Sequence, residues 1–185
     1  MATHYPNRLW ETCLKKALPR ETRSRLRSKV KKIKESNQGI SSTFLKSILS
    51  DLPNFIGVFS QDFLFTLKIV SFPVCFIVNL DLSSEPGSHW IAFFITDKKL
   101  EIYDSFGLDN TTWAREPFFL FNFIDHFPDH KISISPRLQP TFSNLCGVYS
   151  VFFLIFRQCL LFPELIKLFS TDLDLNSTVL LSFFE

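Results

Sequence analysis

A cysteine followed by a glycine stands at the start of a long apolar run, and this position is the first candidate for chemistry. Cys146 and Gly147 precede the nearly unbroken apolar segment 148–156, which ends at Arg157. The pattern predicts a buried helix whose first turn contains the cysteine. Free N–H groups and the positive end of the helix dipole at such a turn favour a thiolate over a thiol. Cys146 is therefore a candidate nucleophile, although a buried structural cysteine beside a helix-packing glycine is the commoner arrangement.

A predicted β-hairpin has to position two further candidates. The segments 89–96 and 100–106 are rich in β-branched and aromatic residues and are joined by a short Asp-Lys-Lys turn. His89 opens the first strand and Asp104 ends the second, so a tight hairpin brings both to one edge of the sheet. There Asp104 would orient the imidazole, and His89 would take or hold the thiol proton. Taken separately, each residue also fits an ordinary turn or packing role.

An amide side chain completes the predicted site. Gln139 lies seven residues before Cys146, where its amide can share an oxyanion with the backbone N–H of the cysteine. Together, His89, Asp104, Gln139 and Cys146 predict a site in which a thiolate attacks a carbonyl carbon.

A zinc site is the rival interpretation of the other polar residues. His126, Asp129 and His130 are close enough in sequence to share a metal ion. The segment HFPDH contains a proline, however, and does not form a helical HExxH motif. We therefore expect neither a metal nor a cofactor.

Composition indicates one packed domain. Hydrophobic residues make up 46% and charged residues 21% of the 185-residue chain, which contains 23 Phe and 5 Gly. The four cysteines have no Cys-x-x-Cys spacing, which argues against a structural zinc site or a disulfide framework. With no signal peptide and no apolar run long enough to cross a bilayer, we expect a reduced nuclear or cytoplasmic protein without membrane contact.

Basic residues are concentrated near the N-terminus. Ten of the 20 Lys and Arg residues lie between Lys15 and Lys34, with one acidic residue among them. We expect residues 1–40 to form a basic N-terminal extension and residues 41–185 to form the catalytic domain. The basic run is a candidate contact for DNA phosphates or a nuclear address, and a solvated helix is the alternative.

The remaining pattern predicts an α+β fold. Strands are expected over 69–80, where Pro73 interrupts, and over 131–134. The segment 55–64 is expected to be irregular. Besides the cysteine helix, helices are expected over 21–35, 43–52, 112–127, 162–169 and 173–185.

At the candidate residues the sequence resembles the adenovirus-type cysteine proteases (adenain), within the fold group that includes the ubiquitin-like-protein-specific proteases. GSHWIAFFI resembles the segment around the family's catalytic His-Trp, and YDSFG resembles its acidic residue followed by Phe-Gly. QPTFSNLCGVYS resembles its pattern of Gln, six residues and Cys-Gly. Weaker similarity extends over residues 41–185. The resemblance implies a papain-like-clan α+β fold, in which a mixed β-sheet packs against a central helix that carries the nucleophile at its N-terminus.

The same resemblance implies a role for each candidate residue. It makes Cys146 the nucleophile, His89 the general base or ion-pair partner, Asp104 the orienting acid and Gln139 the oxyanion donor. It implies a monomeric cysteine endopeptidase that cleaves viral or virus-like (transposon) precursor proteins after small residues such as Gly, as in virion maturation. Its partners would be a protein substrate and, through the 15–34 segment, DNA.

Two alternatives remain open. One is a processing protease or isopeptidase for ubiquitin-like modifiers, and Asp104 fits it because adenain typically has Glu at this position. The other is an inactive module that keeps the protease fold in order to bind protein or nucleic acid. Adenain is activated by a peptide through a disulfide, but this chain has no cysteine between Asp104 and Gln139. An activator of that kind is therefore not expected.

Overall fold

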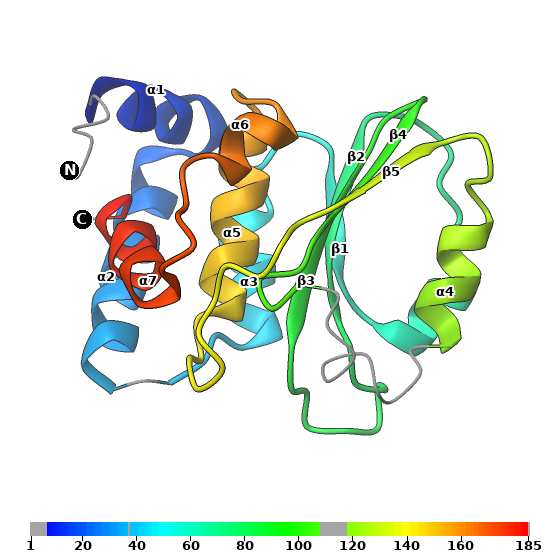
Figure 1. The fold of residues 1–185 in the computed structure, drawn as a ribbon, viewed down its shortest axis with the longest axis horizontal. Helices are drawn as coiled ribbons and strands as arrows, with labels where there is room; N and C mark the ends of the chain where they lie inside the picture. The colour runs from blue at the N-terminus through cyan, green and yellow to red at the C-terminus, as the bar shows by residue number, and fades with distance from the viewer. Residues whose placement is uncertain (1–6, 37, 108–117, 185) are drawn as a thin grey trace.

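In the computed structural model, which describes residues 7–36, 38–107 and 118–184, a five-stranded mixed sheet forms the middle layer (Figure 1). The strands lie in chain order across the sheet, as β1 (Phe55–Ser60), β2 (Val74–Asn79), β3 (Trp90–Ile95), β4 (Lys99–Tyr103) and β5 (Lys131–Ile134). The β1/β2 and β4/β5 pairs are parallel, whereas β3 is antiparallel to both of its neighbours. The predicted hairpin is therefore confirmed as β3 and β4.

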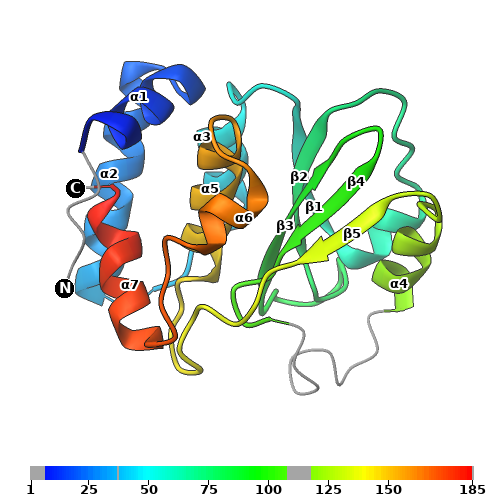
Figure 2. The same cartoon turned by 45° about the horizontal axis from the view of Figure 1, so that its top comes forward.

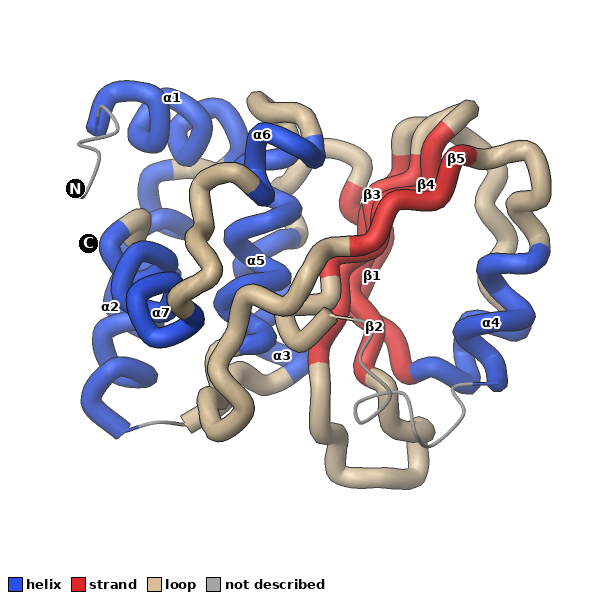
Figure 3. The backbone as a smooth tube through the Cα atoms, in the orientation of Figure 1, coloured by secondary structure: helices blue, strands red, loops and turns tan. Residues whose placement is uncertain are grey.

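Helices cover both faces of this sheet (Figures 1 and 3). On one face α5 lies between the sheet and an outer layer of helices, as Figure 2 also shows. The opposite face carries α4 and a short 3-10 helix, η1. The helices are α1 (Asn7–Ala17), α2 (Arg20–Ser36), α3 (Ser42–Leu49), η1 (Gln61–Phe65), α4 (Phe118–Asp125), α5 (Cys146–Arg157), α6 (Phe162–Ile166) and α7 (Leu173–Ser182).

The side chains of β2 show why the sheet has to be covered on both faces. Val74, Phe76 and Val78 point to the α4 side, and Cys75 and Ile77 point to the α5 side. All five are buried. A strand that is apolar on both faces is stable only between two layers of other elements. The predicted α+β class, with a mixed sheet packed against a central helix, is confirmed.

The central helix begins where the sequence predicted. α5 starts at Cys146, and every residue from Cys146 to Phe156 is buried. Its all-round apolar character is that of a core helix, because no side of it faces water. The cysteine therefore lies at the N-terminus of α5.

The predicted basic extension contributes to the same core. Trp10 of α1 and Ile33 of α2 are buried, and Trp10 meets the ring of Phe156 edge-on with the ring centroids 5.0 Å apart. The thin apolar stripe of α2 is thus the face that it buries. The change in composition does not coincide with an end of the core, and the separate folding of 41–185 stays a prediction.

Two predictions for the segment before the hairpin were wrong. Residues 55–64 are not irregular, because they form β1 and most of η1. β1 pairs in parallel with β2, and its register shifts between Phe55 and Gly57, so the strand has neither a local partner nor a regular alternation. The strand predicted over 69–80 begins only at Val74, after the cis Phe72–Pro73 bond.

The other predicted elements are close to those observed. Ser41 caps α3 and accepts a hydrogen bond from Phe44 N at 3.3 Å. The helices expected over 162–169 and 173–185 are present as α6 and α7. The helix expected over 112–127 is described only from Phe118 onward, and residues 112–117 lie outside the described residues. Within the described part of the chain, every helix is too short or too polar to cross a lipid bilayer.

Candidate active site

Cys146 is held at the first turn of α5 by close packing around the next residue. A Cβ atom added to Gly147 would lie 3.1 Å from Cβ of Ile40 and 3.2 Å from Cδ1 of Trp90. The Trp90 indole N–H also donates a hydrogen bond to Ile40 O at 2.9 Å. Glycine at this position therefore lets β3 and the segment before α3 approach the helix terminus. Cys146 itself retains 8% exposure.

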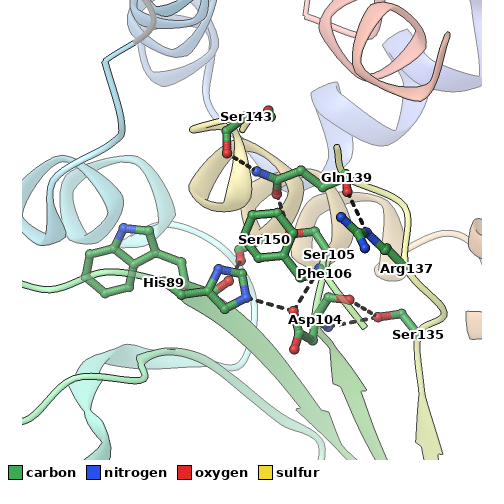
Figure 4. A network of polar contacts seen from close by, with 10 residues as sticks. His89, Asp104, Ser105, Phe106, Ser135, Arg137, Gln139, Ser143 and Ser150 are labelled. Atoms are coloured by element: carbon green, nitrogen blue, oxygen red, sulfur yellow. Dashed lines mark hydrogen bonds and ion pairs between the residues drawn. The ribbon is translucent and has the colours of Figure 1, made fainter. Parts of the chain in front are cut away.

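The hairpin brings His89 and Asp104 together. His89 directly precedes β3 and Asp104 directly follows β4, and the two strands are antiparallel neighbours. Figure 4 shows the His89 ring directed at the carboxylate, and Nε2–H donates to Asp104 Oδ1 at 2.7 Å. Both residues are buried, with 4% exposure for His89 and none for Asp104.

Neighbouring residues fix this carboxylate and this ring. The Phe106 backbone N–H donates to Asp104 Oδ1 at 2.9 Å. Ser135 Oγ accepts from Asp104 N at 2.8 Å and donates to Asp104 O at 2.6 Å. The Phe106 ring lies against the His89 ring with a centroid separation of 4.7 Å. The pair is therefore held in one geometry before any substrate binds.

The His89 ring also lies near Cys146. Nδ1 is buried and makes no hydrogen bond of normal geometry within the described part of the chain, although Cys146 lies near enough to affect the charge of the ring. Burial by itself would lower the pKa of His89. The bond to Asp104, the contact with Cys146 and the electrostatic interaction with each outweigh burial and raise the pKa of His89 from 6.5 to about 9. The ring is therefore protonated at neutral pH.

Gln139 is close to these residues but enclosed. Its side chain has no exposed surface. The amide Nε2 donates to Ser143 O at 2.5 Å, and Oε1 accepts from Ser105 Oγ at 2.6 Å (Figure 4). The preceding carbonyl, Leu138 O, accepts from Tyr149 Oη of α5 at 3.1 Å. The amide is thus anchored beside the first turns of α5, and a reacting carbonyl reaches it only after the enclosing residues shift.

A groove of about 860 Å³ lies beside the residues that pack on the cysteine turn. Ile40 and Trp90 line it, and both pack against Gly147. Val58 and Phe59 of β1 form part of its wall, and Gly87, from the loop before His89, forms another part. Cys146 does not line the groove itself, which adjoins the cysteine turn through Ile40 and Trp90.

The rival metal residues do not converge. His126 Nδ1 lies 2.6 Å from Asn122 O, and His130 Nε2 lies 2.9 Å from Thr96 O. In the part of the chain that the structure describes, no group of three or more His, Cys, Asp or Glu side chains has an arrangement that could hold a metal ion.

Sequence reasoning missed the serines of the site. Ser105 and Ser135 are buried and bond to Gln139 and Asp104 over separations of 34 and 31 residues. Ser105 directly follows the candidate acid Asp104 at the end of a strand, and this position was a local signal that Ser105 lies near the site. Nothing local in the sequence marks Ser135, because its partner is defined by the pairing of β4 with β5.

Comparisons with known proteins give weak structural likenesses. No protein-family model matches the sequence, and no curated protein matches it at the significance required. The C-terminal protease domain of Ulp1, in complex with Smt3, the yeast orthologue of SUMO, shares 14% identity at a TM-score of 0.43, over 91% of this chain and 93% of that one.

Two other solved structures resemble the chain over smaller parts of their own length. AvrA with IP6 and CoA shares 18% identity at a TM-score of 0.45, over 84% of this chain and 66% of that one. An ASFV protease shares 19% identity at a TM-score of 0.33, over 57% of this chain and 43% of that one. This chain therefore matches less than half of the ASFV protease, and likenesses of this extent carry no functional conclusion.

Proposed function

We propose that the chain is a cysteine peptidase in which Cys146 is the nucleophile. The observation that carries this proposal is the placement of a buried His89–Asp104 pair, with the ring protonated at neutral pH, beside a cysteine at a helix N-terminus. An imidazolium next to a sulfur is the arrangement that stabilises a thiolate for attack on a carbonyl.

The proposed reaction has two steps. Cys146 Sγ bonds to the scissile carbonyl carbon, and the C–N bond breaks as the His89 imidazolium gives its proton to the leaving amine. Neutral His89 then takes a proton from water, whose oxygen attacks the thioester carbon and releases the carboxylate and the thiolate. Asp104 stays ionised throughout and stabilises the charged ring.

Two donors can meet the oxyanion of each step. One is the backbone N–H of Cys146, which has no partner within the helix because it belongs to the first turn. The other is Gln139, whose Nε2 donates one hydrogen to Ser143 O and has no second acceptor among the described residues. We assign the second hydrogen to the oxyanion.

The proposed substrate is a protein chain lying in the groove that leads to Trp90. We further propose a viral or virus-like precursor cleaved after a small residue such as Gly, which is supported by the resemblance of the three sequence segments quoted above. The close approach of Ile40 and Trp90 at the cysteine end of the groove also favours a small side chain there.

Labelling with an electrophilic Gly-Gly peptide probe tests the nucleophile. The adduct should map to Cys146, and Cys146→Ala should lose both labelling and cleavage. Cys159 is the matched control, because it is more exposed than Cys146 and has no imidazole partner among the described residues. Labelling that follows exposure and maps to Cys159 would contradict the proposal, and labelling without turnover would favour the inactive binding module.

The alternative substrate is a ubiquitin-like modifier. A fluorogenic ubiquitin-like conjugate and a Gly-Gly precursor peptide should be compared by kcat/KM. Faster hydrolysis of the peptide supports precursor cleavage, and much faster hydrolysis of the conjugate supports the modifier-processing alternative.

We also propose that α2 contacts the phosphates of DNA. The helix carries eight basic and two acidic residues, and Lys31 and Lys32 are exposed on it. Replacing both by Ala should weaken DNA binding and reduce the slope of log K against log[salt] by about 0.9 for each phosphate that is no longer neutralised. The matched control is Lys98→Ala with Lys99→Ala, at the exposed turn of the hairpin. Equal effects of the two pairs would reject a specific role for α2.

A further inference from the structure

Two consecutive residues after β4 hold two different parts of the candidate site. The Asp104 carboxylate accepts the bond from His89, and the Ser105 hydroxyl donates to the Gln139 amide at 2.6 Å (Figure 4). Ser105 and Gln139 are buried, with 1% and 0% exposure. A hydroxyl placed on a fully buried amide has an orienting role, because water cannot replace it as a partner.

The partners of the amide define which way it points. Ser143 O can only accept, so it must face the N–H₂ group, and Oε1 must then take the hydrogen of Ser105. The reversed amide would set Oε1 against the carbonyl oxygen of Ser143. It would also turn an oxygen toward the position where the oxyanion develops.

Ser105 is the firmer of these two anchors. Its carbonyl accepts the backbone N–H groups of Leu138 and Gln139 at 2.8 and 2.9 Å, so backbone and side chain together clamp the 138–139 segment. Ser143 instead holds the amide through one backbone carbonyl and is itself only partly buried. During a turnover Ser105 would keep the amide oriented, with one Nε2 hydrogen on Ser143 O and the other directed at the oxyanion.

We propose that Ser105 is a positioning residue for the oxyanion donor. Its hydroxyl occupies Gln139 Oε1 and thereby keeps the Nε2 hydrogens directed at Ser143 and at the oxyanion. Ser105 does not touch the substrate. This inference rests on the proposed function, in which Gln139 stabilises the oxyanion.

A double-mutant cycle in the full chain tests the proposal. Gln139→Ala should lower kcat by about 10²-fold. Ser105→Ala should lower kcat about tenfold with little change in KM, as expected for the loss of one neutral hydrogen bond that acts in the transition state. In the Gln139→Ala background, Ser105→Ala should have no further effect on kcat.

Ser135→Ala is the matched control. Ser135 is also a buried serine with short hydrogen bonds, but its partner is the Asp104 backbone. Its effect on kcat should therefore multiply with that of Gln139→Ala. Wild-type kcat in Ser105→Ala, or multiplication of the Ser105 and Gln139 effects, would overturn the proposal.

A second readout does not depend on turnover. The side-chain ¹⁵N–H₂ signals of Gln139, assigned by their loss in Gln139→Ala, should exchange slowly with water in the wild type. In Ser105→Ala they should shift and lose protection, whereas Ser135→Ala should leave them in place. Unchanged signals in Ser105→Ala would refute the positioning role even if the chain showed no peptidase activity. Failure of the proposed function would appear in a different experiment, as absent labelling of Cys146 by the peptide probe.

Discussion

The charge of His89 at neutral pH depends on Asp104 and Cys146. Burial opposes a charged ring, but the bond to Asp104 and the electrostatic interactions with Asp104 and Cys146 raise the pKa of His89 to about 9. A ring with this pKa is available as the acid that protonates a leaving amine. As the pH rises through this value, the ring loses its proton and the sulfur loses its counter-charge.

The pH profile of hydrolysis should reflect this residue. We expect kcat/KM to fall as the pH rises through about 9, and Asp104→Asn to move this alkaline limb to lower pH because one source of negative charge is gone. Profiles of kcat/KM over roughly pH 5 to 10 on a peptide substrate locate the alkaline limb in the wild type and in Asp104→Asn. Asp129→Asn, at an exposed loop aspartate, is the control that should leave the limb in place. An alkaline limb that Asp104→Asn does not move would contradict the assignment.

The same pair links stability to pH. The pKa of His89 is higher in the folded state than its ordinary value, so its contribution to stability is fully present below about 6.5 and is lost as the pH rises through about 9. The free energy of unfolding should be measured with urea at about pH 6.5 and at about pH 9. Its decrease between these two pH values should be smaller in Asp104→Asn than in the wild type.

At the scale of elements, the site depends on how closely β3 and the segment before α3 approach the start of α5. Gly147 makes this approach possible, since a side chain there would press on Ile40 and Trp90 at 3.1 and 3.2 Å. Displacing the helix start by a few tenths of an ångström would move Cys146 relative to His89. Small displacements of a nucleophile have large effects on rate.

Gly147→Ala should therefore lower kcat by about tenfold or more while the protein stays folded. Alanine favours helix over glycine by about 1 kcal/mol, so a loss of activity would not be explained by helix propensity. Gly39→Ala is the matched control, because a Cβ there would meet only Asn144 O at an ordinary 3.9 Å. Circular dichroism shows whether both variants are folded, and kcat shows whether the rate falls in Gly147→Ala alone. Full activity of Gly147→Ala would show that the close approach is not needed.

The elements that carry local patterns could be predicted from the sequence, and those defined by distant pairing could not. The apolar run after Cys146 and the two strands around an Asp-Lys-Lys turn were sufficient to locate α5 and the hairpin. β1 was missed because its partner β2 lies beyond η1 and its register is irregular. The bonds of Trp90 to Ile40 and of Ser105 to Gln139 span 50 and 34 residues, and no periodicity reports such contacts.

For the whole molecule, the basic N-terminal helices belong to the core that supports the site. Trp10 packs on Phe156 of α5, and Val30 and Ile33 of α2 are buried. Composition alone predicted residues 1–40 to be an extension separate from the domain, because charged side chains outnumber apolar ones in the basic segment. The few apolar residues nevertheless decide where the helices lie, since burial depends on one face and not on the average.

Removal of residues 1–40 should therefore destabilise the protein as well as remove its basic charge. We expect the truncated chain to lose cooperative urea unfolding and to bind a hydrophobic dye, because the outer side of α5 loses its cover. The full-length chain carrying Lys31→Ala and Lys32→Ala is the control, and it should unfold like the wild type. Cooperative unfolding of the truncated chain at unchanged midpoint would instead support an independent 41–185 domain.

Asp104 and Ser105 both follow β4 directly. Their contacts with His89 and Gln139 therefore depend on the number of residues in the turn between β3 and β4. Successive side chains beyond a strand point to opposite sides, so a slip of one position between β3 and β4 would turn Asp104 from His89 and Ser105 from Gln139 in the same event. The turn that sets this alignment is tied by Thr96, whose Oγ1 accepts the backbone N–H groups of Lys98 and Lys99 at 3.3 and 3.0 Å. Insertion or deletion of a single amino acid in this turn should therefore separate both pairs of residues, although every residue of the candidate site would still be present in the sequence.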